Sequence, residues 1–314
     1  MKNKIIYQSF LFSLFLFLSY DTFVHLCRPN WSVAQYPQQD NIIKAENFLY
    51  SPKEHETIIV GSSLSTYLNM DLLPNVTNLA FSGMSIYEGL GILQKKDIAP
   101  KMILVEMNVI TRTQDKKFVE SVTAPIPSAL KRVFISLRED KQPLGIIALY
   151  IRLKIGSSKL ITEITKISDK FFNIFSNRNI GSFQPLGDNA RLTEKTDDKF
   201  EELLRLQSKD YAKIPNIAFT NEQFTNLKII VDKLEEKGVK VVFFEMPVDK
   251  SLCQMPKAKD IREKFYSVFS RSTYSYIDMP DCETYKTADG IHLQKEDANR
   301  YSMLLYQKMV PFLK

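Results

Sequence analysis

Polar side chains suited to acyl-transfer chemistry stand at the ends of three apolar runs and just before the last helical segment. The motif "GSS", residues 61–63, follows the apolar run "TIIV". Gly83 closes "NLAFSG", and Asn108 closes "MILVEMN". Near the C-terminus, "TADGIHLQ" places Asp289 and His292 three residues apart. Such a set of residue types predicts a serine nucleophile with its base, its orienting carboxylate and its oxyanion donors.

Each candidate residue has a definite role in that chemistry. Ser63 is the expected nucleophile, and His292 is the base that removes its proton. Asp289 is the carboxylate that orients the imidazole. The Gly83 N–H and the Asn108 amide are the donors expected for the oxyanion, together with the Ser63 N–H.

Every one of these residues also has an ordinary structural interpretation. Ser63 is a suitable helix N-cap, Gly83 a turn glycine and Asn108 a turn former at a strand end. Asp289 is suited to capping a turn, with His292 on the surface. No single motif is specific, and it is their order along the chain, at strand ends, that favours a catalytic site.

The segments between these residues alternate β-branched runs with helical spacing, which is typical of an α/β fold with a mostly parallel sheet. In such a sheet, ligands bind at the carboxyl ends of the strands, where the candidate residues fall. The predicted strands are 56–61, 76–83, 102–108, 239–247 and 274–278, and the predicted helices are 86–96, 221–238, 258–270 and 295–311.

The N-terminus predicts a membrane anchor. Lys2 and Lys4 precede an uncharged apolar stretch, residues 5–20, and no small-residue cleavage site follows it. We expect residues 1–27 to be an uncleaved signal anchor, single-pass, with the rest of the chain extracytoplasmic, either periplasmic or extracellular. A cleaved signal peptide is the alternative. Residues 28–50 are expected to form a polar juxtamembrane segment.

The main α/β domain is expected to cover residues 51–314, with a helical insertion at about 113–220. Helical spacing recurs there at 128–137 and 157–176, and the apolar run 144–151 is too short to span a bilayer. Basic residues beside apolar faces leave two alternatives open for the insertion. One is docking on a membrane surface or membrane partner, and the other is an ordinary helical subdomain.

Composition excludes some classes of function. The net charge of +6 is spread along the chain without a basic stripe, so we expect no nucleic-acid partner. Three histidines and three cysteines without metal-ligand spacing predict neither a metal nor another cofactor. A Cys253–Cys282 disulfide and three unpaired thiols both stay open as alternatives.

In this order, the motifs resemble those of the SGNH (GDSL-like) hydrolase superfamily. The family's first block matches residues 61–63, its second-block glycine Gly83, its third-block asparagine Asn108, and its Asp-x-x-His block Asp289 and His292. The resemblance covers residues 56–112 and about 221–314. It implies a flavodoxin-like three-layer sandwich and assigns the same catalytic triad and oxyanion donors.

Departures from the family pattern point to a subgroup. Ser62 stands where the family has aspartate, and Glu106 and Arg112 flank Asn108 in place of the usual glycine and aspartate. With the anchor, this looks similar to membrane-anchored SGNH proteins that O-acylate cell-surface or exported glycans beside a multi-pass membrane O-acyltransferase.

The resemblance implies extracytoplasmic O-acetylation of a polysaccharide through an acyl-serine, from an acyl donor to a glycan acceptor. Two alternatives stay open. One is a carbohydrate O-acetylesterase that uses the same triad. The other is a non-catalytic glycan-binding protein or scaffold partner of the membrane O-acyltransferase.

Overall fold

The computed structural model describes residues 2–27, 37–52, 55–143, 145 and 197–313, which fall into two compact units. One unit comprises Met1–Tyr50 and Pro125–Asp188, and the other comprises Ser51–Ala124 and Asn189–Lys314. The second unit contains a parallel β-sheet and all the candidate site residues. The chain is therefore α/β, as predicted.

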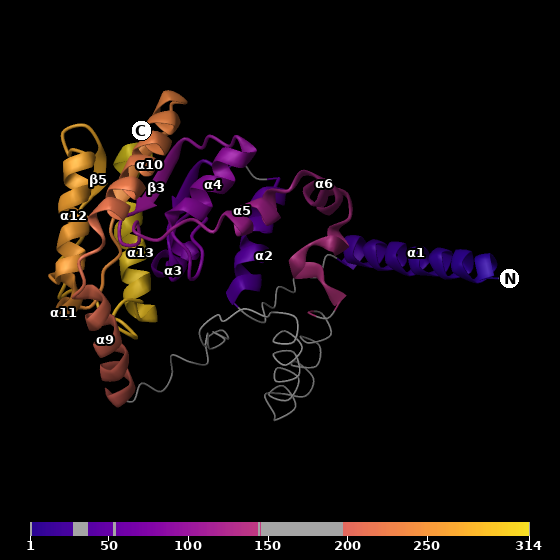
Figure 1. Cartoon of the computed structure of the whole chain (residues 1–314), viewed down its shortest axis with the longest axis horizontal. Coiled ribbons are helices and arrows are strands. Elements are labelled where there is room, and N and C mark those ends of the chain that lie inside the picture. The colour runs from indigo at the N-terminus through magenta and orange to yellow at the C-terminus, as the bar shows by residue number, and fades with distance from the viewer. Residues whose placement is uncertain (1, 28–36, 53–54, 144, 146–196, 314) are drawn as a thin grey trace. The chain divides into compact units, whose positions relative to one another are not determined.

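Within the described residues, the sheet has five parallel strands in the order β2-β1-β3-β4-β5 (Figure 1). These are β1 Thr57–Val60, β2 Val76–Asn78, β3 Met102–Glu106, β4 Lys240–Phe244 and β5 Ser275–Ile277. The unit also contains α3 Ser63–Thr66, η1 Met70–Leu72, α4 Ile86–Lys96, α5 Lys116–Thr123, α9 Asp197–Tyr211, α10 Ile217–Glu236, α11 Lys250–Cys253, α12 Pro256–Val268, α13 Lys295–Met309 and η4 Val310–Leu313.

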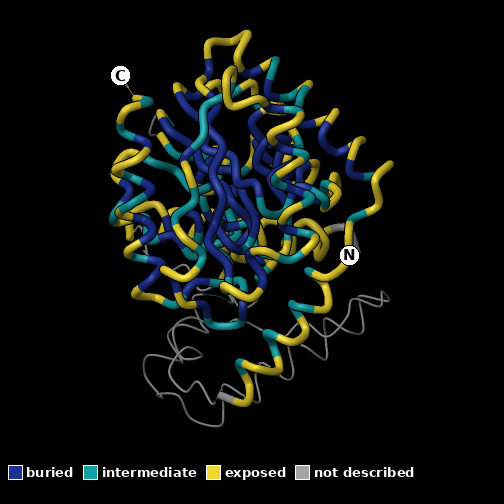
Figure 2. The backbone as a smooth tube through the Cα atoms, turned by 90° about the vertical axis from the view of Figure 1, so that its left-hand side faces the viewer, coloured by how far each residue is buried: buried dark blue, intermediate teal, exposed yellow. Residues whose placement is uncertain are grey.

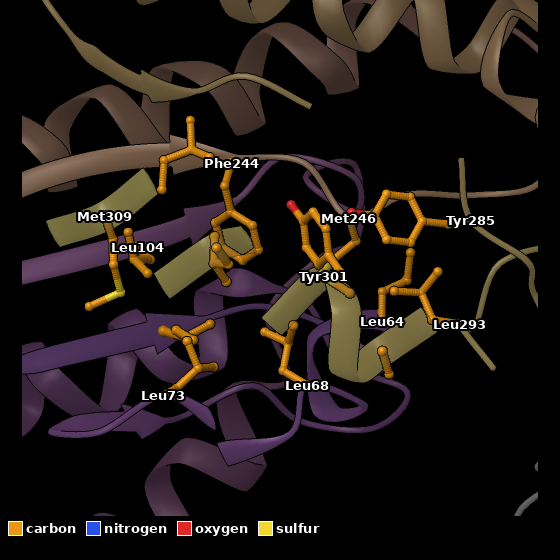
Figure 3. Packing of buried hydrophobic residues seen from close by; sticks show 14 of the residues in the cluster. Leu64, Leu68, Leu73, Leu104, Phe244, Met246, Tyr285, Leu293, Tyr301 and Met309 are labelled. Atoms are coloured by element: carbon orange, nitrogen blue, oxygen red, sulfur yellow. The ribbon is translucent and has the colours of Figure 1, made fainter. Parts of the chain in front are cut away.

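Strands β1 and β3, and β4 after Lys240, are buried (Figure 2) because apolar residues point to both faces of the sheet. Leu104 and Phe244 pack in one cluster with Tyr301 and Met309 of α13 (Figure 3). Phe243 instead meets Phe265 of α12 at 5.4 Å between ring centroids. Phe243 and Phe244 are neighbours in β4 and point to opposite faces of the sheet. A helix therefore packs against each face, α12 at Phe243 and α13 at Phe244.

Helix α4 approaches β1 closely because it carries a glycine at the contact. A Cβ on Gly89 would lie 2.9 Å from Val60 Cγ1. The helix begins at a capping box, in which the Ser85 hydroxyl accepts a hydrogen bond from the backbone of Glu88 and the Glu88 carboxylate accepts the Ser85 N–H. Close packing of α4 fixes the carboxyl end of β1, from which the candidate nucleophile follows.

Several element boundaries differ from those predicted, and polar side chains explain two of the differences. Strand β2 ends at Asn78 rather than continuing to Gly83, because the Asn78 amide accepts the Ala80 N–H at 2.9 Å and turns the chain. Helix α10 begins four residues before its predicted start because Asn216 accepts the Phe219 N–H and caps it.

The first unit contains α1 Lys2–Cys27, α2 Pro37–Tyr50, α6 Pro125–Val133, η2 Ile135–Leu137 and η3 Glu139–Lys141. The segment Lys4–Cys27 is long and apolar enough to span a membrane, a property that signal sequences share. Part of the expected juxtamembrane stretch folds as α2, which buries Ile43 and Phe48.

The predicted insertion is divided between the two units. Helices α5 and α9 belong with the sheet, whereas α6 belongs with α1 and α2. The helix predicted at 157–176 and the apolar run at 144–151, apart from residue 145, lie outside the described residues.

Candidate active site

The turn after β1 presents Ser63 at the carboxyl edge of the sheet. Ser62 adopts an extended conformation and caps α3, its hydroxyl accepting the Leu64 N–H, so that Ser63 is the first helical residue. Gly61 permits this turn, because a Cβ there would lie 2.6 Å from a Glu106 carboxylate oxygen and 2.7 Å from Ser65 Oγ. The N-cap role that was open for Ser63 therefore belongs to Ser62.

Ser63, His292 and Asp289 form a continuous hydrogen-bonded chain. His292 Nε2 lies 3.0 Å from Ser63 Oγ, and His292 Nδ1 lies 2.6 Å from Asp289 Oδ2. The fold joins residues that are 229 positions apart in sequence. This is the geometry of a serine nucleophile, its base and an orienting carboxylate.

The loop before α13 holds Asp289 in a fixed orientation. Asp289 Oδ1 accepts the backbone N–H groups of Ile291 and His292 at 3.1 and 2.9 Å. Burial would raise the pKa of Asp289, but the hydrogen bonds and charge of His292 outweigh it, so the pKa lies below its usual value. Asp289 is thus held as a carboxylate facing the imidazole.

The His292 imidazole packs against an aromatic ring and is partly exposed to solvent. The Tyr67 ring lies 4.9 Å from the His292 ring, centroid to centroid, at an interplanar angle of 36°. Burial, and then the charge of Asp289, raise the pKa of the Tyr67 hydroxyl, which stays neutral beside the site. The His292 and Asp289 side chains keep 17% and 22% of their surface exposed, so a substrate can reach them.

Glu106, at the end of β3, is a buried carboxylate next to the turn that carries Ser63. It accepts Ser62 Oγ at 2.6 Å, Ser65 Oγ at 2.5 Å, and the backbone N–H groups of Ser62 and Ser65 at 2.9 and 3.3 Å. Burial raises the pKa of Glu106 above its usual value, although these four hydrogen bonds act in the opposite direction. The carboxylate therefore holds the residues on both sides of Ser63.

The sequence placed Glu106 near Asn108 but did not reveal this function. The available signal was a polar residue, Ser62, directly after β1, together with an acidic residue at the end of the neighbouring strand. Because β1 and β3 are adjacent and parallel, with Val60 beside Val105, the Glu106 side chain reaches the turn after β1.

The two residues expected as oxyanion donors have well-defined surroundings. Gly83 has φ +75° in the turn from Phe81 to Met84, a conformation that favours glycine. Asn108 Nδ2 donates to the Met246 carbonyl at 2.9 Å, and Asn108 Oδ1 accepts the Met246 N–H at 2.7 Å. The Asn108 side chain thus joins the segment after β3 to the segment after β4. The oxyanion roles of Gly83 and Asn108 stay predictions.

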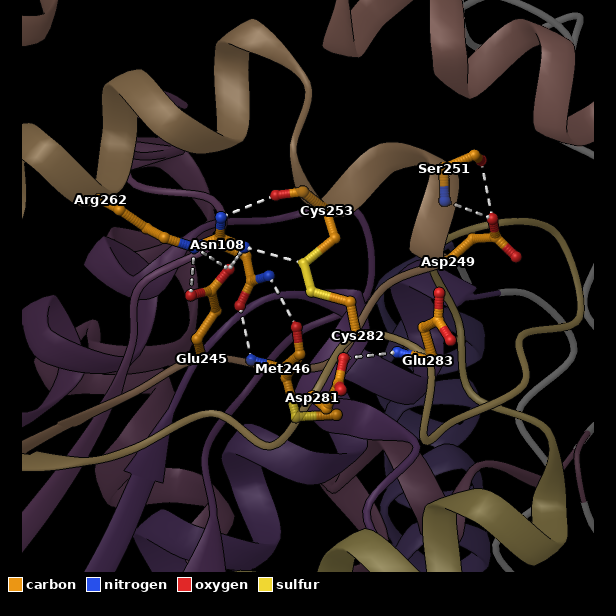
Figure 4. The surroundings of a disulfide bond; sticks show 10 residues. All are labelled: Asn108, Glu245, Met246, Asp249, Ser251, Cys253, Arg262, Asp281, Cys282 and Glu283. Atoms are coloured by element: carbon orange, nitrogen blue, oxygen red, sulfur yellow. Dashed lines mark hydrogen bonds and ion pairs between the residues drawn. A yellow bond between two sulfur atoms is a disulfide. The ribbon is translucent and has the colours of Figure 1, made fainter.

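An ion pair and a disulfide lie next to Asn108 (Figure 4). Arg262 binds both carboxylate oxygens of Glu245 at 2.8–3.1 Å and donates to the Cys253 carbonyl at 2.7 Å. Cys253 is joined to Cys282, with 6.1 Å between their Cα atoms. The alternative of a disulfide, left open by the sequence, is the one present in the structure.

Within the described residues, no cluster of three or more histidine, cysteine or acidic side chains is arranged to hold a metal ion. The site is built instead from a Ser–His–Asp chain and a buried glutamate at the carboxyl edge of a parallel sheet. That combination defines a class, an α/β protein with a hydrogen-bonded serine suited to nucleophilic chemistry. No family model and no curated protein sequence matches this chain, so the SGNH resemblance stays a prediction.

Proposed function

We propose that this chain is an SGNH-type serine O-acyltransferase with the three-layer fold of that superfamily. It acts on a glycan outside the cytoplasm and is held to the membrane by α1. The Ser63–His292–Asp289 chain carries the proposal, because its two hydrogen bonds of 3.0 and 2.6 Å supply a nucleophile with an oriented base.

In the proposed reaction, Ser63 Oγ attacks the carbonyl carbon of an acyl ester or thioester, and its proton passes to His292 Nε2. The tetrahedral intermediate collapses when His292 returns that proton to the leaving alcohol or thiol, which leaves acyl-Ser63. A sugar hydroxyl then attacks the acyl-serine, His292 takes its proton, and Ser63 recovers a proton as the acylated glycan departs.

Retention of α1 is supported by its contacts with the rest of the first unit. Tyr20 Oη donates to the Lys141 carbonyl at 2.6 Å, and Asp21 accepts the Ser136 N–H at 3.0 Å. Val24 is fully buried. A signal peptide that is removed has no need of such contacts, so these interactions favour an anchor over a cleaved signal.

The acyl-enzyme step is tested by treating the full-length protein with a fluorophosphonate probe and identifying the labelled peptide by mass spectrometry. We expect label on Ser63 that is lost in Ser63→Ala and His292→Ala. Ser251→Ala is the matched serine control, because Ser251 bonds to Asp249 without a histidine. His55→Ala is the histidine control. A folded protein without label on Ser63 would instead support the glycan-binding or scaffold alternative.

A second experiment separates the transferase from the esterase. The full-length protein is given p-nitrophenyl acetate with and without short oligosaccharides of several sugars. A transferase releases p-nitrophenol faster with acceptor and yields acetylated sugar, whereas an esterase releases acetate at a rate that does not depend on acceptor.

A further inference from the structure

Helix α6 has an inverted distribution of polar and apolar residues. Its outward face carries Ile126, Leu130 and Val133, which are 75%, 45% and 63% exposed. Its inward side carries the buried Ser128 and Lys131, whose ammonium group pairs with a buried glutamate of α2 at 2.5 Å. A helix on the surface of a globular protein normally has the opposite arrangement, with its apolar residues facing the core.

The segment that directly follows α6 contacts the candidate membrane span. Phe134 directly follows the helix, and its ring lies 5.3 Å from that of Phe17 in α1. The next turn, η2, also contacts α1, and its Ser136 N–H donates to Asp21 at 3.0 Å. Val133 is therefore adjacent in sequence to a residue that contacts the apolar span itself.

The length of α1 places these contacts at membrane depth. Its continuous run of exposed, uncharged residues, 5–16, covers only about 18 Å at about 1.5 Å per residue. The hydrocarbon core of a bilayer is about 30 Å thick. To cross it, α1 needs about 20 residues of Lys4–Cys27, so the span includes Phe17 and Asp21, which contact Phe134 and η2. The neighbouring face of α6 then meets the outer leaflet.

We propose that the apolar face of α6, formed by Ile126, Leu130 and Val133, inserts into the lipid interface of the membrane that α1 crosses. This inference rests on the proposed anchoring by α1 and goes beyond the proposed acyl transfer. Burying three apolar side chains there favours the bound position, as for other interfacial helices. The face would hold the first unit flat against the bilayer rather than leave it on a flexible tether.

The test places one fluorescent label at a time on the full-length protein in phosphatidylcholine–phosphatidylglycerol vesicles, using lipids brominated near the headgroup or deep in the acyl chain. Cys27, which is exposed, is first replaced by serine. Labels are then attached to Ile126→Cys, Leu130→Cys and Val133→Cys. We expect headgroup-brominated lipids to quench all three and aqueous iodide to quench none of them strongly.

Two reference sites make the result decisive. A label at Phe12→Cys in α1 should be quenched by the deeply brominated lipid, and one at the exposed Glu236→Cys should respond only to iodide. Quenching at residue 12 with iodide-accessible labels on α6 overturns the inference but keeps the anchor. Absence of quenching at residue 12 refutes the anchor itself. Protection of α6 that depends on protein concentration, without lipid quenching, would assign the face to a second copy and also overturn the inference.

Discussion

Two substitutions of Glu106, by leucine and by glutamine, should show whether it acts by holding the turn around Ser63 or by its negative charge. In Glu106→Leu, the buried N–H groups of Ser62 and Ser65 lose their acceptor. Each unsatisfied buried donor costs about 1–3 kcal/mol, so we expect a loss of roughly 2–6 kcal/mol in the free energy of unfolding. The hydroxyls of Ser62 and Ser65 can rotate toward other acceptors, so they add less.

The isosteric Glu106→Gln variant should retain most of that stability. Its amide oxygen can occupy the position of Oε2, which accepts both backbone N–H groups and Ser65 Oγ. Its amide nitrogen can donate to Ser62 Oγ in place of the present Oε1 contact. We expect a cost of about 1 kcal/mol for the single exchanged hydrogen bond.

Reactivity of Ser63 should follow the geometry of its turn. We expect Glu106→Gln to label with fluorophosphonate within about tenfold of the natural rate. Glu106→Leu should fall by about a hundredfold, because a displacement of about 1 Å misaligns the nucleophile from its base. The assay pairs labelling rates with denaturant unfolding of the same preparations.

Glu88→Gln is the matched control. Glu88 is also buried, and its two oxygens accept the N–H groups of Ser85 and Asp115, so glutamine cannot satisfy both. It should lose about 1–3 kcal/mol of stability without slowing the labelling of Ser63. Natural-rate labelling by a folded Glu106→Leu protein would refute the positioning role.

Stability should also depend on pH through Glu106. Its pKa in the folded protein lies above the ordinary value of 4.5. A carboxyl group with a raised folded pKa contributes its full stability below the unfolded pKa and loses it as the pH rises through the folded pKa. The natural protein should therefore lose stability relative to Glu106→Gln as the pH rises from below about 4.5 toward neutrality. A difference that does not change with pH would contradict this.

Three further changes should have distinct outcomes. Asp289→Asn should keep the fold but lower the rate of acyl-enzyme formation by about 10²–10⁴, because the imidazole loses its orienting carboxylate; an unchanged rate in single-turnover assays would contradict the triad. Replacing Cys253 and Cys282 by serine should lower the free energy of unfolding by about 3 kcal/mol, since the two cysteines are 29 residues apart in sequence. Thermal unfolding of the natural protein with and without reductant measures this difference. Asn108→Ala should cost about 1–3 kcal/mol in denaturant unfolding, because the Met246 N–H and carbonyl lose their partners, and labelling should fall further if Asn108 is an oxyanion donor.

Local sequence determined most of the α/β elements. The apolar runs at β1, β3 and β4 are too short for typical helices and contain β-branched residues, and the parallel sheet follows from their alternation with helices. It also indicated the candidate triad, because Ser63 follows a strand end and Asp289 and His292 stand just before the last helix. Boundaries such as the end of β2 were missed, since a single amide contact from Asn78 sets them.

Tertiary structure alone decided which of these residues meet. The 3.0 Å contact between Ser63 and His292 joins positions 229 residues apart, and no local pattern encodes that distance. The same is true of the Cys253–Cys282 pair and of Glu106 next to the turn that carries Ser63. Glu106, at the end of β3, holds the turn after the neighbouring strand β1. The order and register of the strands in the sheet determine this contact, and spacing along the chain does not.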